Sequence, residues 1–292
     1  MTRSSPEHSN ALSPDFWLGF GAAGAFCAIV GLLSVRFAAR IFGTAFTELD
    51  YLKKALWHVY SYCFFCGVIS NLLLAGDMYT LFYDRAFDVE YLMNGQHGPR
   101  YQRATGFSLG FLAFDLAVML CWPRTLLAAY KKPLFVQMLI HHGISLFAWP
   151  QCIWLGRGHG MVSYLIFTET TSLFLNLHWL LREGKASGTW IIINGVCLFF
   201  SFLFVRILTI PWALWLYFSC SKETWTIYEI ATSMLFVPLP PLLNLFWFKL
   251  IARGTAEKLG IIKARQPTKK NGDSGNGAHA SEVQTKNGAK QE

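Results

Sequence analysis

Two adjacent histidines, His141 and His142, lie in a stretch of the chain that is otherwise apolar. A carboxylate, Asp115, lies in similar surroundings within residues 111–120, and Glu169 lies in a further apolar segment. Such groups are costly in hydrocarbon, usually face the interior of a helix bundle, and bind a polar group or line a pathway there. The His pair and these carboxylates are therefore the residues most able to do chemistry.

Helical spacing separates the two histidines. Gln137, His141 and Ser145 recur at i, i+4 and i+8 and form one polar face. His142 lies about 100° away from that face on the same helix. We therefore expect the two imidazoles to contact different neighbours.

Other polar residues also lie inside apolar segments. Glu169, Ser172 and Asn176 recur at i, i+3 and i+7, and Asn194 lies in the next segment. Asp115 lies 9 residues from Arg124, Asn194 lies 9 from Lys185 and His142 lies 10 from Lys132. At 1.5 Å per residue, each is roughly 14 Å from its basic flank. The sequence predicts a polar site open to the cytosolic leaflet, formed by Asp115, His141, His142, Glu169, Ser172, Asn176 and Asn194.

A simpler function for these residues is to join helices. Interhelical hydrogen bonds in membranes contribute well under about 2 kcal/mol each and are common in helix bundles. This alternative suits Ser145, Asn176 and Asn194 taken singly. It suits the His pair less well, because two imidazoles and a carboxylate exceed what packing requires.

The composition defines the environment of these residues. Of 292 residues, 53% are hydrophobic and 14% are charged, whereas a soluble chain carries about 25% charged residues. Aromatic residues make up 16%, which excludes low-complexity disorder for most of the chain, as well as collagen-like and coiled-coil classes. We expect an all-α, multi-pass membrane protein.

Apolar runs of about 20 residues are long enough to cross a bilayer. The sequence contains seven, and the first is expected to be a helix of the mature protein. They lie near residues 15–35, 55–76, 104–122, 134–155, 161–181, 189–218 and 226–250. The expected organisation is a short extramembrane N-terminus (1–14), a first helix with a basic loop (15–50), a six-helix domain (51–253) and a cytosolic tail (254–292).

The positions of Lys and Arg predict the orientation, because cytoplasmic segments retain basic residues. With the N-terminus outside, 18 of the 25 basic residues are cytoplasmic and six lie on the opposite side. The net charge of +8 then faces an anionic cytosolic leaflet, and a nucleic-acid partner is unnecessary. The basic tail from about residue 266 contains no aromatic residue and is expected to be disordered.

The cysteines give little evidence of a metal or redox site. Cys63 and Cys66 form a CxxC spacing inside an apolar run with no second pair, so we interpret them as buried small residues. Cys152 and Cys220 both lie near the predicted outer surface, and whether they form a disulfide is left open. We expect no metal and no resident cofactor.

Two charged residues lie toward the outer ends of predicted helices. Arg206 lies 21 residues from Lys185, so we expect it near the outer side, where it can neutralise Glu229. Glu229 lies near the end of its segment and is expected to be solvated. The prolines of residues 238–241 predict a structural kink in the same helix.

At these positions the sequence resembles the TLC-domain membrane proteins, the family that includes the ceramide synthases, over roughly residues 50–250. The resemblance rests on residues 110–115 (Gly-Phe-Leu-Ala-Phe-Asp), His141-His142, residues 169–179, Asn194-Gly195 and Arg206-Ile207. It is greatest to the small TLC-domain-containing proteins with the pattern E-x-x-x-x-F-L-N-x-x-W. That resemblance implies lipid homeostasis in the endoplasmic reticulum, with the plasma membrane as the other location.

The chain departs from the ceramide synthases at one motif. In those enzymes a His pair and a later His-Asp-x-x-Asp segment are implicated in moving an acyl group from acyl-CoA to a sphingoid amine. Here the later segment has Glu169 and Ser172 at the two acidic positions. If acyl transfer occurs, His141 or His142 acts as nucleophile or general base and Asp115 or Glu169 orients it.

Three classes of function therefore stay open. The first is a protein that binds or handles a membrane lipid in an intramembrane polar cavity. The second is a lipid N-acyltransferase of the ceramide synthase type, for which acyl-CoA is a substrate. The third is a transporter or channel. The sequence leaves the lipid and the oligomeric state open.

Overall fold

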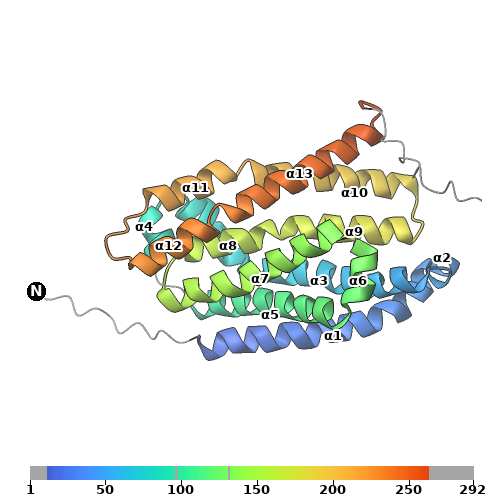
Figure 1. The fold of residues 1–292 in the computed structure, drawn as a ribbon, viewed down its shortest axis with the longest axis horizontal. Helices are drawn as coiled ribbons and strands as arrows, with labels where there is room; N and C mark the ends of the chain where they lie inside the picture. The colour runs from blue at the N-terminus through green and yellow to red at the C-terminus, as the bar shows by residue number, and fades with distance from the viewer. Residues whose placement is uncertain (1–11, 96–97, 131, 263–292) are drawn as a thin grey trace, which may run out of the picture. The chain divides into compact units, whose positions relative to one another are not determined.

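The protein is all-helical in the residues that the structure describes. The computed structural model describes residues 12–95, 98–130 and 132–262, and Figure 1 shows its helices. The chain divides into two compact units, residues 1–255 and 256–292, and the candidate site lies in the first. The elements are α1 (Pro14–Phe42), α2 (Thr44–Thr47), α3 (Tyr51–Tyr79), the π-helix η1 (Thr80–Asp84), α4 (Val89–Asn94), α5 (Pro99–Cys121), α6 (Pro123–Tyr130), α7 (Lys132–Leu155), α8 (His159–Thr168), α9 (Thr170–Glu183), α10 (Gly188–Ser201), the π-helix η2 (Phe202–Ile207), α11 (Ile210–Ser219), α12 (Ile227–Phe236) and α13 (Leu239–Lys258).

Five helical stretches are long and apolar enough to cross a membrane, which makes this an integral, multi-pass membrane protein. They are Pro14–Phe42, Tyr51–Asp84, Pro99–Cys121, Gly188–Ser219 and Ile227–Lys258. Two further predicted spans coincide with α7 and with the α8–α9 pair. Polar residues interrupt the apolar sequence of α7. The helices α8 and α9 have 10 and 14 residues and are separated at Glu169.

Local sequence determines where several helices begin. Ser13 caps α1 through its side chain, which accepts from a backbone N–H, and Pro14 occupies the first turn. Asp50 caps α3 in the same way. Thr226 and Glu229 form a reciprocal capping box at the start of α12. In each of these three first turns, a side chain therefore satisfies at least one of the free N–H groups.

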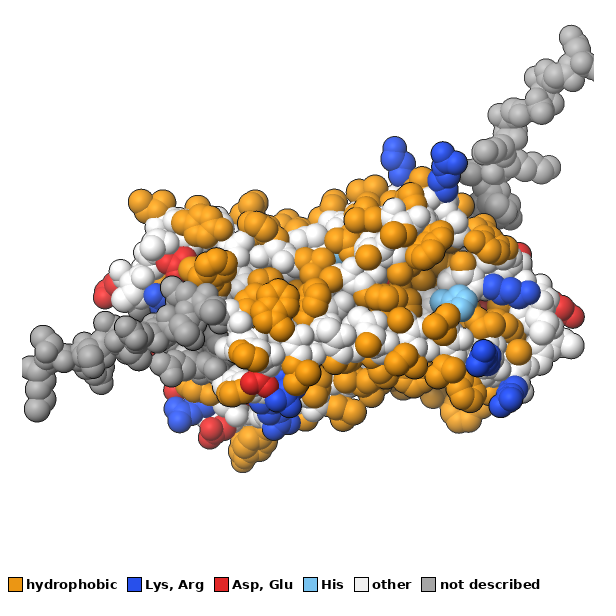
Figure 2. All heavy atoms as spheres, turned by 90° about the horizontal axis from the view of Figure 1, so that it is seen from below, with side chains coloured by type: hydrophobic (Ala, Val, Ile, Leu, Met, Phe, Trp, Pro, Cys, Tyr) orange, Lys and Arg blue, Asp and Glu red, His pale blue; other side chains and the backbone are white. Residues whose placement is uncertain are grey.

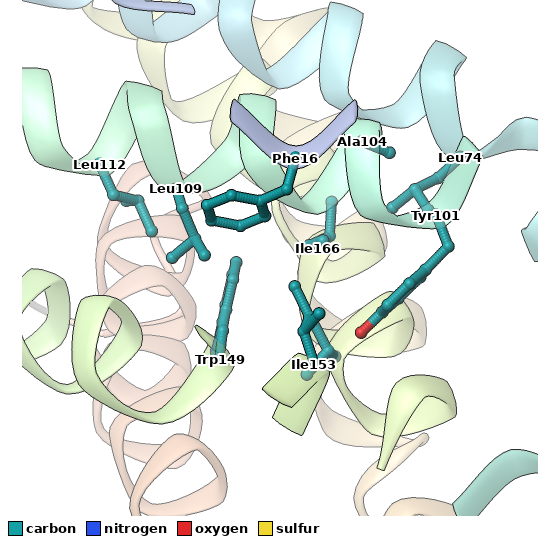
Figure 3. Packing of buried hydrophobic residues seen from close by; sticks show 10 residues of the cluster. Phe16, Leu74, Tyr101, Ala104, Leu109, Leu112, Trp149, Ile153 and Ile166 are labelled. Atoms are coloured by element: carbon teal, nitrogen blue, oxygen red, sulfur yellow. The ribbon is translucent and has the colours of Figure 1, made fainter. Parts of the chain in front are cut away.

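Close contact between α1 and α5 depends on glycines, two of which lie on α5. A Cβ atom at Gly106 or Gly110 would collide with backbone atoms of Phe16 or Phe20. Small residues four positions apart let two membrane helices approach closely. Figure 3 shows the result, with Phe16 of α1 beside Leu109 of α5. The same core cluster includes Trp149 and Ile153 of α7, Ile166 of α8 and Leu74 of α3.

The surface pattern agrees with a membrane environment. Figure 2 shows hydrophobic side chains over the middle of one face and charged side chains toward its two ends. Exposed apolar residues include Leu32, Trp190 and Leu242. An apolar surface of this extent is typical of a protein that contacts lipid.

Ion pairs join two basic segments at one end of the helices. Lys53 lies 3.0 Å from Glu183, and Lys185 lies 3.0 Å from Glu48. Burial alone would raise the pKa of Glu183, but hydrogen bonds from Lys53 and Arg182 hold this pKa below its usual range. The start of α3 and the residues before it are therefore held to the end of α9 and the turn after it.

Candidate functional site

A break between α8 and α9 presents Glu169 to the interior. The hydroxyls of Thr168 and Thr170 donate to the carbonyls of Leu165 and Phe167, each over 2.6 Å. Hydroxyls bonded in this way compete with the helical hydrogen-bond pattern. At the break, the backbone N–H groups of Glu169 and Ser172 donate to the carbonyls three residues earlier, a tighter spacing than that of an α-helix. The carboxylate of Glu169 therefore projects from a helix junction.

The π-helix η2 positions Arg206 opposite this junction. Arg206 is buried, and its Nε donates to the carbonyl of Thr168 (3.0 Å) and to Oγ1 of Thr171 (2.7 Å). Its Nη2 donates to Oε1 of Glu169 (3.1 Å) and its Nη1 to Oδ1 of Asn244 (3.1 Å). Single π-helical turns are frequent at functional sites. Here the turn joins α8, α9 and α13 through one guanidinium group.

The carboxylate of Glu169 is fully hydrogen-bonded, whereas the ring of His141 is not. Oε2 of Glu169 accepts a hydrogen bond of 2.7 Å from Ser172, so both carboxylate oxygens have partners. Nε2 of His141 lies 3.9 Å from Oε1 of Glu169, which is too long for a hydrogen bond. The ring of His141 packs edge-on against Trp247, with centroids 5.6 Å apart. In the described part of the chain, the His141 ring forms no hydrogen bond.

The neighbouring histidine belongs to a second cluster. Tyr62 of α3 donates to Oδ1 of Asp115 over 2.5 Å, and Oδ2 of Asp115 lies 3.4 Å from Nε2 of His142. Both Asp115 and His142 are buried. Nδ1 of His142 has no partner among the described residues. The two histidines thus face different carboxylates, in agreement with their spacing on the helix.

A cavity of about 160 Å³ is lined by residues of α7 and α8 and by residues of η2, α11, α12 and α13. Its wall is mostly apolar, with His141, Glu169, Arg206 and Asn244 at one end and Arg157, Trp225 and Glu229 at the other. Because Arg157 follows α7 and Trp225 precedes α12, the cavity extends away from the Lys132 end of α7. The sequence predicted a polar site that opens toward this basic end of α7, whereas the cavity extends in the opposite direction.

The seven residues predicted to form one polar site lie in different places. His141 and Glu169 line the cavity, and the hydroxyl of Ser172 donates a hydrogen bond to Glu169. Asp115 and His142 form the separate buried cluster, and Asn176 is buried within α9. Asn194 donates to the carbonyl of Phe174 over 2.8 Å and so joins α10 to α9.

The structure corrects the expected partner of Arg206. Arg206 pairs with Glu169 and not with Glu229, which instead accepts from Nε of Arg157 over 3.4 Å. The expected solvation of Glu229 is also wrong, because the residue is 7% exposed and caps α12. Arg157 also donates to Asn94 (2.9 Å) and to Thr224, and so ties three connections together at this end of the cavity.

Sequence reasoning did not assign four residues to the site. Arg206 and Asn244 are polar residues inside apolar segments, a pattern that indicates a functional site. Arg157 lies in a short connection, and Tyr62 is one of several aromatic residues in its helix. Neither of these two has a sequence pattern that distinguishes it.

The described cysteines are free thiols, including Cys152 and Cys220. Cys66 is buried and its Sγ lies 3.4 Å from Sγ of Cys27. Among the described residues, no group of three or more His, Cys, Asp or Glu side chains is placed to hold a metal ion.

Comparisons with known proteins agree with the motif evidence. The family model described as the TLC domain matches residues 52–253. The chain is 28% identical over 149 residues to TLC domain-containing protein 4 A of Dictyostelium discoideum, an alignment that covers 48% of this chain and 56% of that protein. The chain thus spans little more than half the length of that curated relative. No solved structure matches.

Proposed function

The chain belongs to the TLC domain family, and from that premise we propose that it acts in lipid homeostasis by holding a membrane lipid in its intramembrane cavity. The single observation that carries the proposal is the cavity wall. It is apolar along most of its length and carries a compact polar cluster at one end, formed by His141, Glu169, Arg206 and Asn244. Sites that bind small molecules are typically apolar with few polar groups that set orientation.

The geometry supports a defined orientation of that lipid. Apolar residues such as Ile144, Leu165 and Phe236 line the cavity between its two polar ends. A lipid chain can lie along these side chains, with its polar group at His141. The polar group then sits beside the one side chain of the four-residue cluster that has no hydrogen bond.

This proposal is tested by filling the cavity. Ala148 of α7 lines the cavity, whereas Ala28 of α1 is exposed. Ala148→Phe and Ala28→Phe proteins are purified alongside the wild type, and their retained lipids are quantified by mass spectrometry. We expect one lipid class to be enriched in the wild type and in Ala28→Phe and depleted in Ala148→Phe. Equal lipid content in all three proteins contradicts the proposal.

We further propose seven crossings, with the N-terminus outside and the C-terminus in the cytosol. The sequence favours this arrangement, because 18 basic residues then face the cytosol and six face outside. Two sets of contacts support it. Lys53 pairs with Glu183 at one end, and Asn94 contacts both Arg157 and the carbonyl of Ser221 at the other.

Glycosylation acceptors inserted between residues 96 and 97 and at the C-terminus test this topology. Modification of the loop alone is expected, and modification of the tail alone rejects it. In this arrangement the basic loops and tail contact the anionic cytosolic leaflet.

We propose the endoplasmic reticulum as the location, with the plasma membrane as the alternative, and imaging of the tagged full chain distinguishes them.

One observation favours a second candidate, an acyl-CoA-dependent lipid N-acyltransferase. His141 lies in the cavity wall beside Glu169, where an imidazole can act as a base. However, Glu169 is already bonded to Arg206 and Ser172, and His142 lies outside the wall. Purified protein supplied with acyl-CoA and a sphingoid base is expected to form no amide. Amide formation that His141→Ala abolishes would establish the enzyme instead.

A further inference from the structure

The charged side chains in the cavity wall are balanced. The wall contains two guanidinium groups, Arg157 and Arg206, and two carboxylates, Glu169 and Glu229. Arg206 lies 3.1 Å from Glu169, and Arg157 lies 3.4 Å from Glu229. Each end of the cavity therefore contains one cation paired with one anion.

These pairs are also saturated with hydrogen bonds. Arg206 donates to five groups on α8, α9 and α13. Arg157 donates to Glu229, Asn94 and Thr224. A charged ligand group would have to displace one of these partners or remain unpaired in a low-dielectric environment, and either is costly. The wall therefore disfavours both anionic and cationic groups.

Two polar side chains in the wall keep unused hydrogen-bonding capacity. His141 and Ser145 lie one helical turn apart on α7 and both line the cavity. Neither side chain forms a hydrogen bond within the described residues. An imidazole and a hydroxyl can together donate to and accept from an uncharged oxygen or amide.

We propose that the cavity selects an amphiphile whose polar group is uncharged, a hydroxyl, ester or amide on a long alkyl chain, and that His141 and Ser145 bind this group. This inference rests on the proposed function, because it names the class of lipid that the same cavity holds. The paired charges then stabilise the cavity wall, and His141 and Ser145 recognise the polar group of the ligand.

The experiment compares three probes that share one alkyl chain. Hexadecanol, palmitate and hexadecylamine compete with tritium-labelled hexadecanol for the purified full-length protein in detergent near neutral pH. Hexadecanol is expected to compete more than about tenfold better than either charged probe, because an unpaired charge in the cavity is penalised. His141→Leu should weaken hexadecanol binding by roughly fivefold, the effect of one hydrogen bond of typical net strength.

A change of charge in the wall provides a gain-of-function test. Glu169→Gln and Glu229→Gln each remove one anion and leave Arg206 or Arg157 without its counter-ion. Each variant is expected to bind palmitate about tenfold more tightly than the wild type, because the palmitate carboxylate can pair with the guanidinium that has lost its counter-ion. A tenfold change in affinity corresponds to about 1.4 kcal/mol. Glu223→Gln is the matched control, because Glu223 is exposed and outside the wall. If Glu169→Gln does not fold, Glu229→Gln decides alone.

Three results would overturn the inference. The first is a charged probe that competes as well as hexadecanol for the wild type. The second is palmitate affinity that does not rise in either folded cavity variant, or that rises equally in Glu223→Gln. In both of these cases the cavity still binds lipid. The third is a lack of saturable binding by all three probes, which would overturn the proposed function as well.

Discussion

His142 and Asp115 contact each other between α7 and α5, with Nε2 and Oδ2 3.4 Å apart and both side chains buried away from the cavity. Tyr62 completes this cluster from α3. Three helices thus meet at one carboxylate immediately behind His141. We interpret this cluster as the group that fixes the rotation of α7, and thereby keeps His141 in the cavity wall.

Asp115→Asn tests this interpretation. The amide keeps the size of the side chain but loses the charge that Tyr62 and His142 contact, so the free energy of unfolding should fall by about 1–3 kcal/mol. His141→Leu should change it by less than about 1 kcal/mol, because that ring makes no hydrogen bond. Thermal unfolding in detergent measures both. A stable Asp115→Asn protein that has lost lipid binding would show that Asp115 contacts the ligand.

The Arg206–Glu169 pair should be strongly coupled. Arg206→Met alone leaves a carboxylate without its counter-ion and is expected to cost about 3–5 kcal/mol, as for other buried pairs that lose one partner. Adding Glu169→Gln removes the remaining charge, so the double variant should be more stable than Arg206→Met. A double-mutant cycle of unfolding free energies measures the coupling. Additive effects of the two substitutions would argue against a functional ion pair.

Gly106→Ala and Gly110→Ala should separate α1 from α5. A methyl group at either position meets the backbone of α1, and such overpacking costs about 1–3 kcal/mol. Gly143→Ala is the control, because a Cβ there meets no atom within 4 Å. Unfolding temperatures of the three variants give the comparison. Equal stability of all three would mean that the α1–α5 contact is looser than the structure shows.

The sequence was sufficient for the class of fold and for the separation of the two histidines. Apolar runs and their length depend on residue type alone, and the positions of His141 and His142 on one helix fix the angle between their side chains. The break at Glu169 and the π-helical turn at Arg206 were not predicted. Both depend on local departures from the α-helical hydrogen-bond pattern that no spacing reveals.

Those departures explain why the partner of Arg206 was assigned wrongly. Counting 1.5 Å per residue assumes straight, parallel α-helices that start at the same level. Residue counts therefore placed Arg206 near Glu229 rather than beside Glu169. The cavity was equally inaccessible to such counting, because its wall combines side chains from α7 to α13 that only the tertiary structure brings together.

Photochemical labelling tests the central claim, that a lipid lies inside the cavity, most directly. A hexadecanol analogue with a diazirine in its alkyl chain is bound to the full-length protein, irradiated and located by peptide mass spectrometry. We predict labelling of cavity residues such as Ile144, Leu165 and Phe236, suppressed by excess unlabelled hexadecanol. Labelling confined to exposed surface residues such as Leu32 and Trp190, with no effect of the competitor, would contradict the account.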